Sequence, residues 1–164
     1  MYFWFLENCR QSNRFCQFQV EKTIQKEPGS VYILGELIHN QQASNKLKTW
    51  GIKTIDNLKK IKNKRGMVIL RAHGEPPPTY QKLKDLHLKF VDTTCPNVIK
   101  IQKLAKKLSN EGFFVVVCGK KDHPEPKATL GYIKKGLIID STEDAEKISP
   151  KKRINPQIRT ILPV

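Results

Sequence analysis

Short apolar runs alternate along the chain with longer segments whose apolar positions recur at helical spacing. The runs predict strands over residues 30–34, 52–55, 67–70, 89–92, 113–118 and 137–140. The longer segments predict helices over residues 41–50, 56–61 and 79–86, from Pro96 to Asn110, and from Ser141 onward. Strands alternating with helices are typical of parallel α/β structure. The pattern therefore predicts an α/β fold of tandem small parallel-sheet modules.

The junction between strand and helix at Cys95 divides this pattern into two similar halves. Pro96 fits the first helical position, where its missing N–H costs nothing, and Cys95 then precedes the helix as its N-cap. One apolar face of this helix is expected to comprise Val98, Ile101, Leu104, Ala105 and Leu108. We predict four segments: a divergent N-terminal segment (1–19), a first α/β module (20–95), an incomplete second module (96–149) and an irregular C-terminal end (150–164).

Reactive side chains follow four of the predicted strands. His39, His73 and Cys95 each come shortly after a strand, and His123 and Glu125 follow the strand that ends at Cys118. The carboxyl ends of parallel strands form the edge at which α/β proteins bind ligands. A single histidine after a strand is more often a hydrogen-bonding loop residue, but four such coincidences favour a shared site. Imidazoles suit a phosphate or diphosphate, and Glu125 could donate a proton if it is partly desolvated.

The four cysteines contain no C-x-x-C pair, and in a cytosolic chain thiols are more often metal ligands or catalytic groups than disulfides. A helix N-terminus favours the thiolate form of Cys95, which binds soft metals and iron–sulfur clusters. Cys118 ends an apolar strand and is expected in the core. Either Cys9 or Cys16 could be a second cluster ligand.

The formal net charge is +15, from 30 Lys and Arg against 15 Asp and Glu. Such a charge can indicate a nucleic-acid partner. The lysines are spread along the chain and form no stripe interleaved with aromatic residues, so we favour a solvated surface and do not expect a nucleic-acid partner. No apolar run reaches the length of a membrane helix, and residues 1–6 lack the basic flank of a signal peptide. These features predict a cytoplasmic protein.

Four strings occur in the order VYILGELIHN (Val31–Asn40), VILRAHGEPP (Val68–Pro77), DTTCPNVIKIQK (Asp92–Lys103) and GKKDHPEPKATLGY (Gly119–Tyr132). They closely resemble the LytB/IspH family of 4-hydroxy-3-methylbut-2-enyl diphosphate reductases, over residues 20–147. The resemblance implies a reductive dehydroxylase of the methylerythritol phosphate route to isoprenoids, which forms isopentenyl and dimethylallyl diphosphates. It also implies an oxygen-sensitive 4Fe–4S cluster held by three cysteines, ferredoxin or flavodoxin as electron donor, and three α/β modules in a cloverleaf around the cluster.

Carried over by motif, Cys95 resembles a cluster ligand, while His39 and His73 resemble the histidines at the substrate diphosphate. His123 resembles the histidine near the substrate hydroxyl and diphosphate, and Glu125 resembles the proton-relay acid. The N-terminal cysteine motif of the family is altered here: spacing favours Cys9 as the ligand, whereas the local Phe-Cys pair favours Cys16.

The family's third module, with its last cysteine and its Ser/Asn diphosphate contacts, has no counterpart in the sequence. We therefore expect an N-terminal fragment of the enzyme that is weakly active or inactive as an isolated chain. The alternative function is that of a basic nucleic-acid-binding α/β module.

Overall fold

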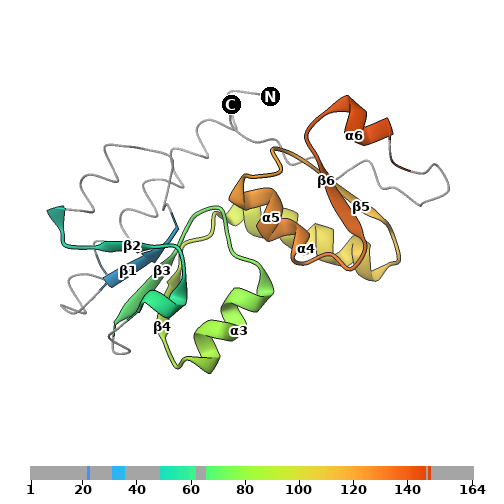
Figure 1. Ribbon diagram of the computed structural model, residues 1–164. Helices are drawn as coiled ribbons and strands as arrows, with labels where there is room; N and C mark the ends of the chain where they lie inside the picture. The colour runs from blue at the N-terminus through green and yellow to red at the C-terminus, as the bar shows by residue number, and fades with distance from the viewer. Residues whose placement is uncertain (1–21, 23–30, 36–48, 62–65, 147, 149–164) are drawn as a thin grey trace. The chain divides into compact units, whose positions relative to one another are not determined.

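The computed structural model describes residues 22, 31–35, 49–61, 66–146 and 148. The contacts within this part of the chain divide it into two compact units, each with its own parallel sheet (Figure 1). The first unit runs to Pro96 except for the segment Glu75–Pro78, which belongs to the second unit together with the chain from Asn97 onward. The segment Glu75–Pro78 therefore packs with the second unit, although in sequence it lies between two parts of the first unit.

The sheet of the first unit has four parallel strands in the order β2-β1-β3-β4. The strands are β1 (Val31–Leu34), β2 (Lys53–Ile55), β3 (Met67–Leu70) and β4 (Lys89–Asp92). The central strand β1 is buried at all four positions, whereas both edge strands contain exposed residues. This difference explains why the sequences VYIL and MVIL are apolar throughout, since central parallel strands are covered on both faces.

Among the residues that the structure describes, two helical elements contribute to the core of this unit. They are the 3-10 turn η1 (Leu58–Lys60) and helix α3 (Pro77–Asp85). Leu58 from η1 and Leu83 from α3 belong to the same buried cluster as Val68 and Leu70 of β3. Burial of these side chains holds the helical elements to the sheet.

In its described part, the second unit contains a two-stranded parallel sheet and three helices. In chain order they are α4 (Pro96–Asn110), β5 (Val115–Cys118), α5 (Pro124–Leu130), β6 (Gly136–Ile139) and α6 (Thr142–Glu146). Ala105 and Leu108 of α4 pack with Val115 of β5, and Phe113 and Ile133 border this cluster. The α/β class and the parallel pairing predicted from the pattern are thus confirmed.

Two local predictions were wrong. The segment predicted as a helix from Asp56 is only a single 3-10 turn. Its cap is Asn57 rather than Asp56, since the Asn57 side chain accepts from the Lys59 N–H at 3.0 Å, and the backbone becomes extended at Ile61. The buried face of α4 comprises Val98, Gln102, Ala105, Leu108 and Ser109, and Leu104 is 41% exposed. Burial of Ser109 is possible because its hydroxyl accepts a hydrogen bond from the Lys134 N–H at 2.8 Å.

In the described part of the chain, no helix has the length and apolar character that crossing a membrane requires. The helix predicted over residues 41–50 lies mostly outside the described residues.

Candidate functional site

The turn that follows β4 fixes the backbone leading to Cys95. One carboxylate oxygen of Asp92 accepts from the N–H of Thr94 at 2.9 Å and from its hydroxyl at 2.5 Å, and the other accepts from the Tyr80 hydroxyl at 2.9 Å. An Asp that bonds the backbone two residues on forms an Asx-turn. Thr93 and Thr94 are buried within this turn. The string DTTC therefore encodes a rigid turn that presents Cys95 at the start of α4.

The chain after β4 also pairs with the chain after β3. The N–H and hydroxyl of Thr93 both donate to the Leu70 carbonyl, and the N–H of Cys95 donates to the Ala72 carbonyl at 2.9 Å. Ala72 immediately precedes His73. The structure therefore brings the Cys95 turn and the His73 loop together at the carboxyl edge of the first sheet. Cys95 and His73 are both half-buried, so neither is enclosed in the core.

His123 caps helix α5 in the second unit. The Nδ1 of its imidazole accepts from the backbone N–H of Glu125 at 3.3 Å. The backbone N–H of His123 donates to the Lys120 carbonyl. A neutral imidazole that accepts through Nδ1 carries its proton on Nε2. The cap therefore favours the tautomer in which His123 donates through Nε2.

Glu125 lies in the first turn of α5 and is 8% exposed. Removal of this carboxyl from water raises its pKa from 4.5 to about 7, because burial disfavours the charged form. Near neutral pH, Glu125 can therefore both hold and release a proton, which is the property that general acid catalysis requires.

The hydrophobic pattern predicts no helix at α5, after the strand that His123 and Glu125 follow. The signals were present: Pro124 occupies the first helical position after the His123 cap, and Gly131 ends the helix. At seven residues, α5 is too short for its apolar spacing to stand out. Its presence explains the burial of Glu125, since Glu125, Ala128 and Thr129 share the inward face of the helix.

The other predicted residues are distributed as follows. His39, Cys9 and Cys16 lie outside the described residues. Cys118, expected in the core, is half-buried at the end of β5. Cys95 with His73 belongs to the first unit and His123 with Glu125 to the second.

As a test of fit to an iron–sulfur cluster, the described residues contain no group of three His, Cys, Asp or Glu side chains that could hold a metal ion. Cys95 is presented by a rigid, half-buried turn, as a ligand must be, but it is a single thiol. The described residues therefore fit one ligand of a cluster and no more.

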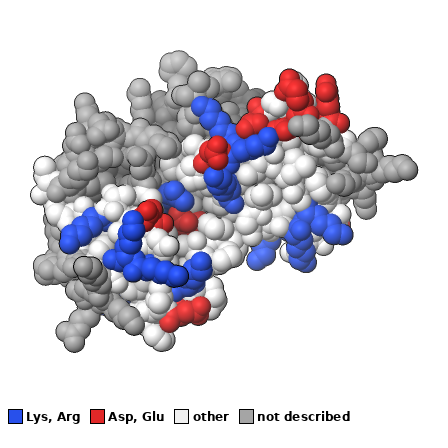
Figure 2. Space-filling view, viewed as in Figure 1, with Lys and Arg blue, Asp and Glu red and all other residues white. Residues whose placement is uncertain are grey.

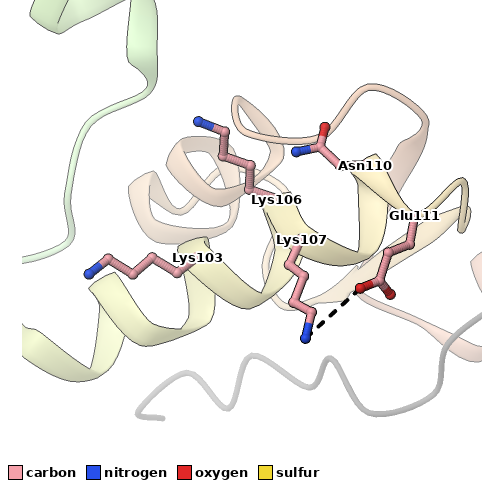
Figure 3. Close-up of a pocket in the computed structure, with 5 residues that line it drawn as sticks. All are labelled: Lys103, Lys106, Lys107, Asn110 and Glu111. Carbon is pink, nitrogen blue, oxygen red and sulfur yellow. Dashed lines mark ion pairs between the residues drawn. The ribbon is translucent and has the colours of Figure 1, made fainter.

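A hollow of about 480 Å³ lies along α4, away in sequence from the predicted site residues. Lys103, Lys106, Lys107, Asn110 and Glu111 line it, and Lys107 pairs with Glu111 at 3.9 Å (Figure 3). Figure 2 shows basic side chains in several separate groups, with acidic ones between some of them. The exposed ion pair between Lys107 and Glu111 contributes little to stability. All five residues that line the hollow are exposed, so none of them is a buried polar group that would mark a binding site.

Comparison with known proteins relates the chain to one family. The family model described as "LytB protein" matches residues 17–162. The 4-hydroxy-3-methylbut-2-enyl diphosphate reductase of Aquifex aeolicus is 36% identical over 138 residues, which cover 82% of this chain and 47% of that protein. The enzyme of the same name from Clostridioides difficile is 40% identical over 119 residues, which cover 73% of this chain and 42% of the relative.

Solved structures agree with these relatives. A structure of (E)-4-hydroxy-3-methyl-but-2-enyl diphosphate reductase, the terminal enzyme of the non-mevalonate pathway, matches with a TM-score of 0.69 and 34% identity, over 84% of this chain and 48% of that one. The Plasmodium falciparum E-1-hydroxy-2-methyl-but-2-enyl-4-diphosphate reductase shares the fold, with a TM-score of 0.82 at 23% identity, over 87% and 46% of the two chains. The chain spans about half the length of the curated relatives it matches. The chain belongs to the LytB family.

Proposed function

We propose that this chain carries thiol, imidazole and carboxyl groups of a reductive dehydroxylase that acts on 4-hydroxy-3-methylbut-2-enyl diphosphate. The observation that carries the proposal is the hydrogen bond from the Cys95 N–H to the Ala72 carbonyl, which joins the thiol turn to the His73 loop. A thiol-bearing turn hydrogen-bonded to an imidazole-bearing loop at the carboxyl edge of a parallel sheet suits a redox reaction on an anionic substrate. The similarity to two named reductases supports the substrate class.

In this proposal, the reaction replaces the allylic C–O bond of the substrate with a C–H bond. The balance requires two electrons and two protons, and the hydroxyl leaves as water. The electrons would come from an external one-electron carrier, ferredoxin or flavodoxin. His73 and His123, together with His39, would bind the diphosphate through imidazole N–H groups. Glu125 would hold a proton near the departing hydroxyl, which its pKa of about 7 allows.

The cofactor of this proposal is a 4Fe–4S cluster, with Cys95 as one ligand and Cys9 as a candidate second one. When bound, such a cluster would supply the electrons that the reduction needs. The role of this chain would be to hold Cys95 on its hydrogen-bonded turn and to position His73 beside it.

Substrate binding tests the imidazoles. Calorimetric titration of the chain with 4-hydroxy-3-methylbut-2-enyl diphosphate should show weaker binding in His73→Asn and His123→Asn. Asparagine retains an N-cap at position 123, so the second variant removes the imidazole while keeping α5 capped. His87→Asn is the matched control, because His87 is exposed and its φ of 52° is a conformation that asparagine accepts. Equal affinity in all three variants would contradict the proposal.

Iron incorporation tests the thiol. After anaerobic reconstitution with iron and sulfide, Cys95→Ser should bind less iron and lose the charge-transfer absorption of the chain. Cys118→Ser, which changes the other half-buried thiol among the described residues, should leave the iron content and the absorption unchanged. If Cys95→Ser retained the iron and absorption of the unmodified chain, Cys95 would not be a ligand. If a histidine variant lost substrate binding but kept its iron, the role of the imidazoles in binding the diphosphate would be separated from the role of Cys95 in binding iron.

A further inference from the structure

The loop that carries His73 continues into the second unit. Glu75, two residues after His73, is 4% exposed, and the segment Glu75–Pro78 packs with the second unit rather than with the sheet that precedes it. The chain returns to the first unit at Thr79. Whatever holds Glu75 and Pro76 therefore limits the positions that His73 can take, because only Gly74 separates them.

Gly131, at the end of α5, approaches this segment closely. Its φ of −60° and ψ of −18° are ordinary right-handed values, so the backbone conformation does not require glycine there. A Cβ at position 131, however, would lie 2.5 Å from the Cβ of Pro76 and 3.3 Å from its Cα. Glycine is therefore needed because Pro76 occupies the space that a side chain would fill.

Tyr132 makes the second contact with the same segment. Its hydroxyl donates to the carbonyl of Glu75 at 3.2 Å, and its ring is half-buried. A hydrogen bond between residues 57 positions apart in sequence fixes a loop that has no regular secondary structure of its own. Gly131 and Tyr132 thus hold Glu75 and Pro76 by two independent contacts.

We propose that Gly131 and Tyr132 are positioning residues for His73, acting through the Glu75–Pro76 segment that they hold. The effect on ligand binding rests on the proposed function, in which His73 binds the diphosphate. Helix α5 then has two roles: its first turn carries Glu125 and the residues at its end restrain the loop of the distant histidine. Neither Gly131 nor Tyr132 needs to touch the substrate.

Hydrogen exchange of the complete chain tests the restraint without reference to activity. In Gly131→Ala and Tyr132→Phe, the amides of Gly74 and Glu75 should exchange at least about tenfold faster, since local opening governs exchange. The amides of β3 should keep their rates. Lys134→Ala, an exposed substitution in the same turn, is the control and should change neither. Unchanged exchange at Gly74 and Glu75 in both test variants would overturn the proposal.

A rescue experiment tests the contact itself. Pro76→Gly removes the Cβ that an alanine at position 131 would meet, so Gly131→Ala with Pro76→Gly should bind 4-hydroxy-3-methylbut-2-enyl diphosphate more tightly than Gly131→Ala alone. Gly131→Ala alone should weaken binding by about tenfold, because a displaced His73 imidazole would lose its hydrogen bond to the charged diphosphate. Weaker or equal binding by the double variant would contradict the steric argument. If the unmodified chain does not bind the diphosphate, the proposed function fails. The hydrogen-exchange experiment would still show whether Gly131 and Tyr132 restrain the Glu75–Pro76 segment.

Discussion

Replacement of Glu125 by glutamine should make the stability of the protein less dependent on pH. Below pH 4.5 the carboxyl is protonated in both the folded and the unfolded chain. Above that pH the unfolded chain ionises while the folded chain keeps its proton until pH about 7. The unfolded state then binds fewer protons than the folded state, so the free energy of unfolding falls as the pH rises through this window.

The magnitude follows from the pKa. A carboxyl whose pKa moves from 4.5 to about 7 has an ionised form that is disfavoured in the folded state by about 3 kcal/mol. Because the side chain is 8% exposed, solvent screens this cost only slightly. Glutamine has nearly the same shape and never ionises. The difference in the free energy of unfolding between Glu125→Gln and the unmodified protein should therefore change by about 3 kcal/mol between pH 4.5 and pH 8.5, in favour of the variant at the higher pH.

Urea unfolding at both pH values measures this difference. The linear extrapolation gives the free energy of unfolding for each protein, and the slope shows whether the same surface is exposed. Glu146→Gln, at an exposed position of α6, is the matched control and should show no such pH dependence. If the difference between Glu125→Gln and the unmodified protein is the same at both pH values, burial does not raise the pKa of Glu125 and its role as a proton donor loses its physical basis.

Three further substitutions test the fold around the site. Leu83→Ala should cost about 2–5 kcal/mol in urea unfolding because Leu83 is fully buried, whereas Leu86→Ala, at a position 37% exposed, should cost far less. Thr93→Val removes the hydroxyl that donates to the Leu70 carbonyl and should cost about 1 kcal/mol by the same assay, although the Thr93 N–H still reaches that oxygen. The Asp144 carboxylate pairs with Lys121, which holds its pKa at about 2, so Asp144→Asn should lower the melting temperature slightly above pH 4. This effect should be smaller at high salt and should diminish as the pH falls from 4 through 2. An unchanged melting temperature of Asp144→Asn at low salt and neutral pH would show that this exposed pair contributes no stability.

The proximity of the His73 loop to the Cys95 turn was predictable because it depends on strand ends. Both residues follow strands whose apolar sequences are plain, and parallel pairing of neighbouring strands places such loops at one edge. What the pattern could not give is the turn itself: the bonds from Thr94 and Tyr80 to Asp92 depend on which side chains meet in three dimensions. The pairing of Cys95 with Ala72 likewise depends on the register of β3 against β4.

Buried polar residues account for the error in α4, and in α5 they add to the effect of its short length. Hydrophobic spacing assumes that buried positions are apolar, but Gln102, Ser109, Glu125 and Thr129 are buried polar residues. At Ser109 the reason is a hydrogen bond to a residue 25 positions away, which no local pattern records. The same assumption predicts that the apolar Leu104 lies on the inner face of α4, but Leu104 is exposed.

The sequence by itself determined the α/β class, the parallel strands and the family, since all three follow from local periodicity and from ordered motifs. Only the tertiary structure decided the chemical state of Glu125 and the need for glycine at position 131. A pKa depends on the water that folding removes, and a close approach depends on a distant residue, here Pro76, that occupies the same space.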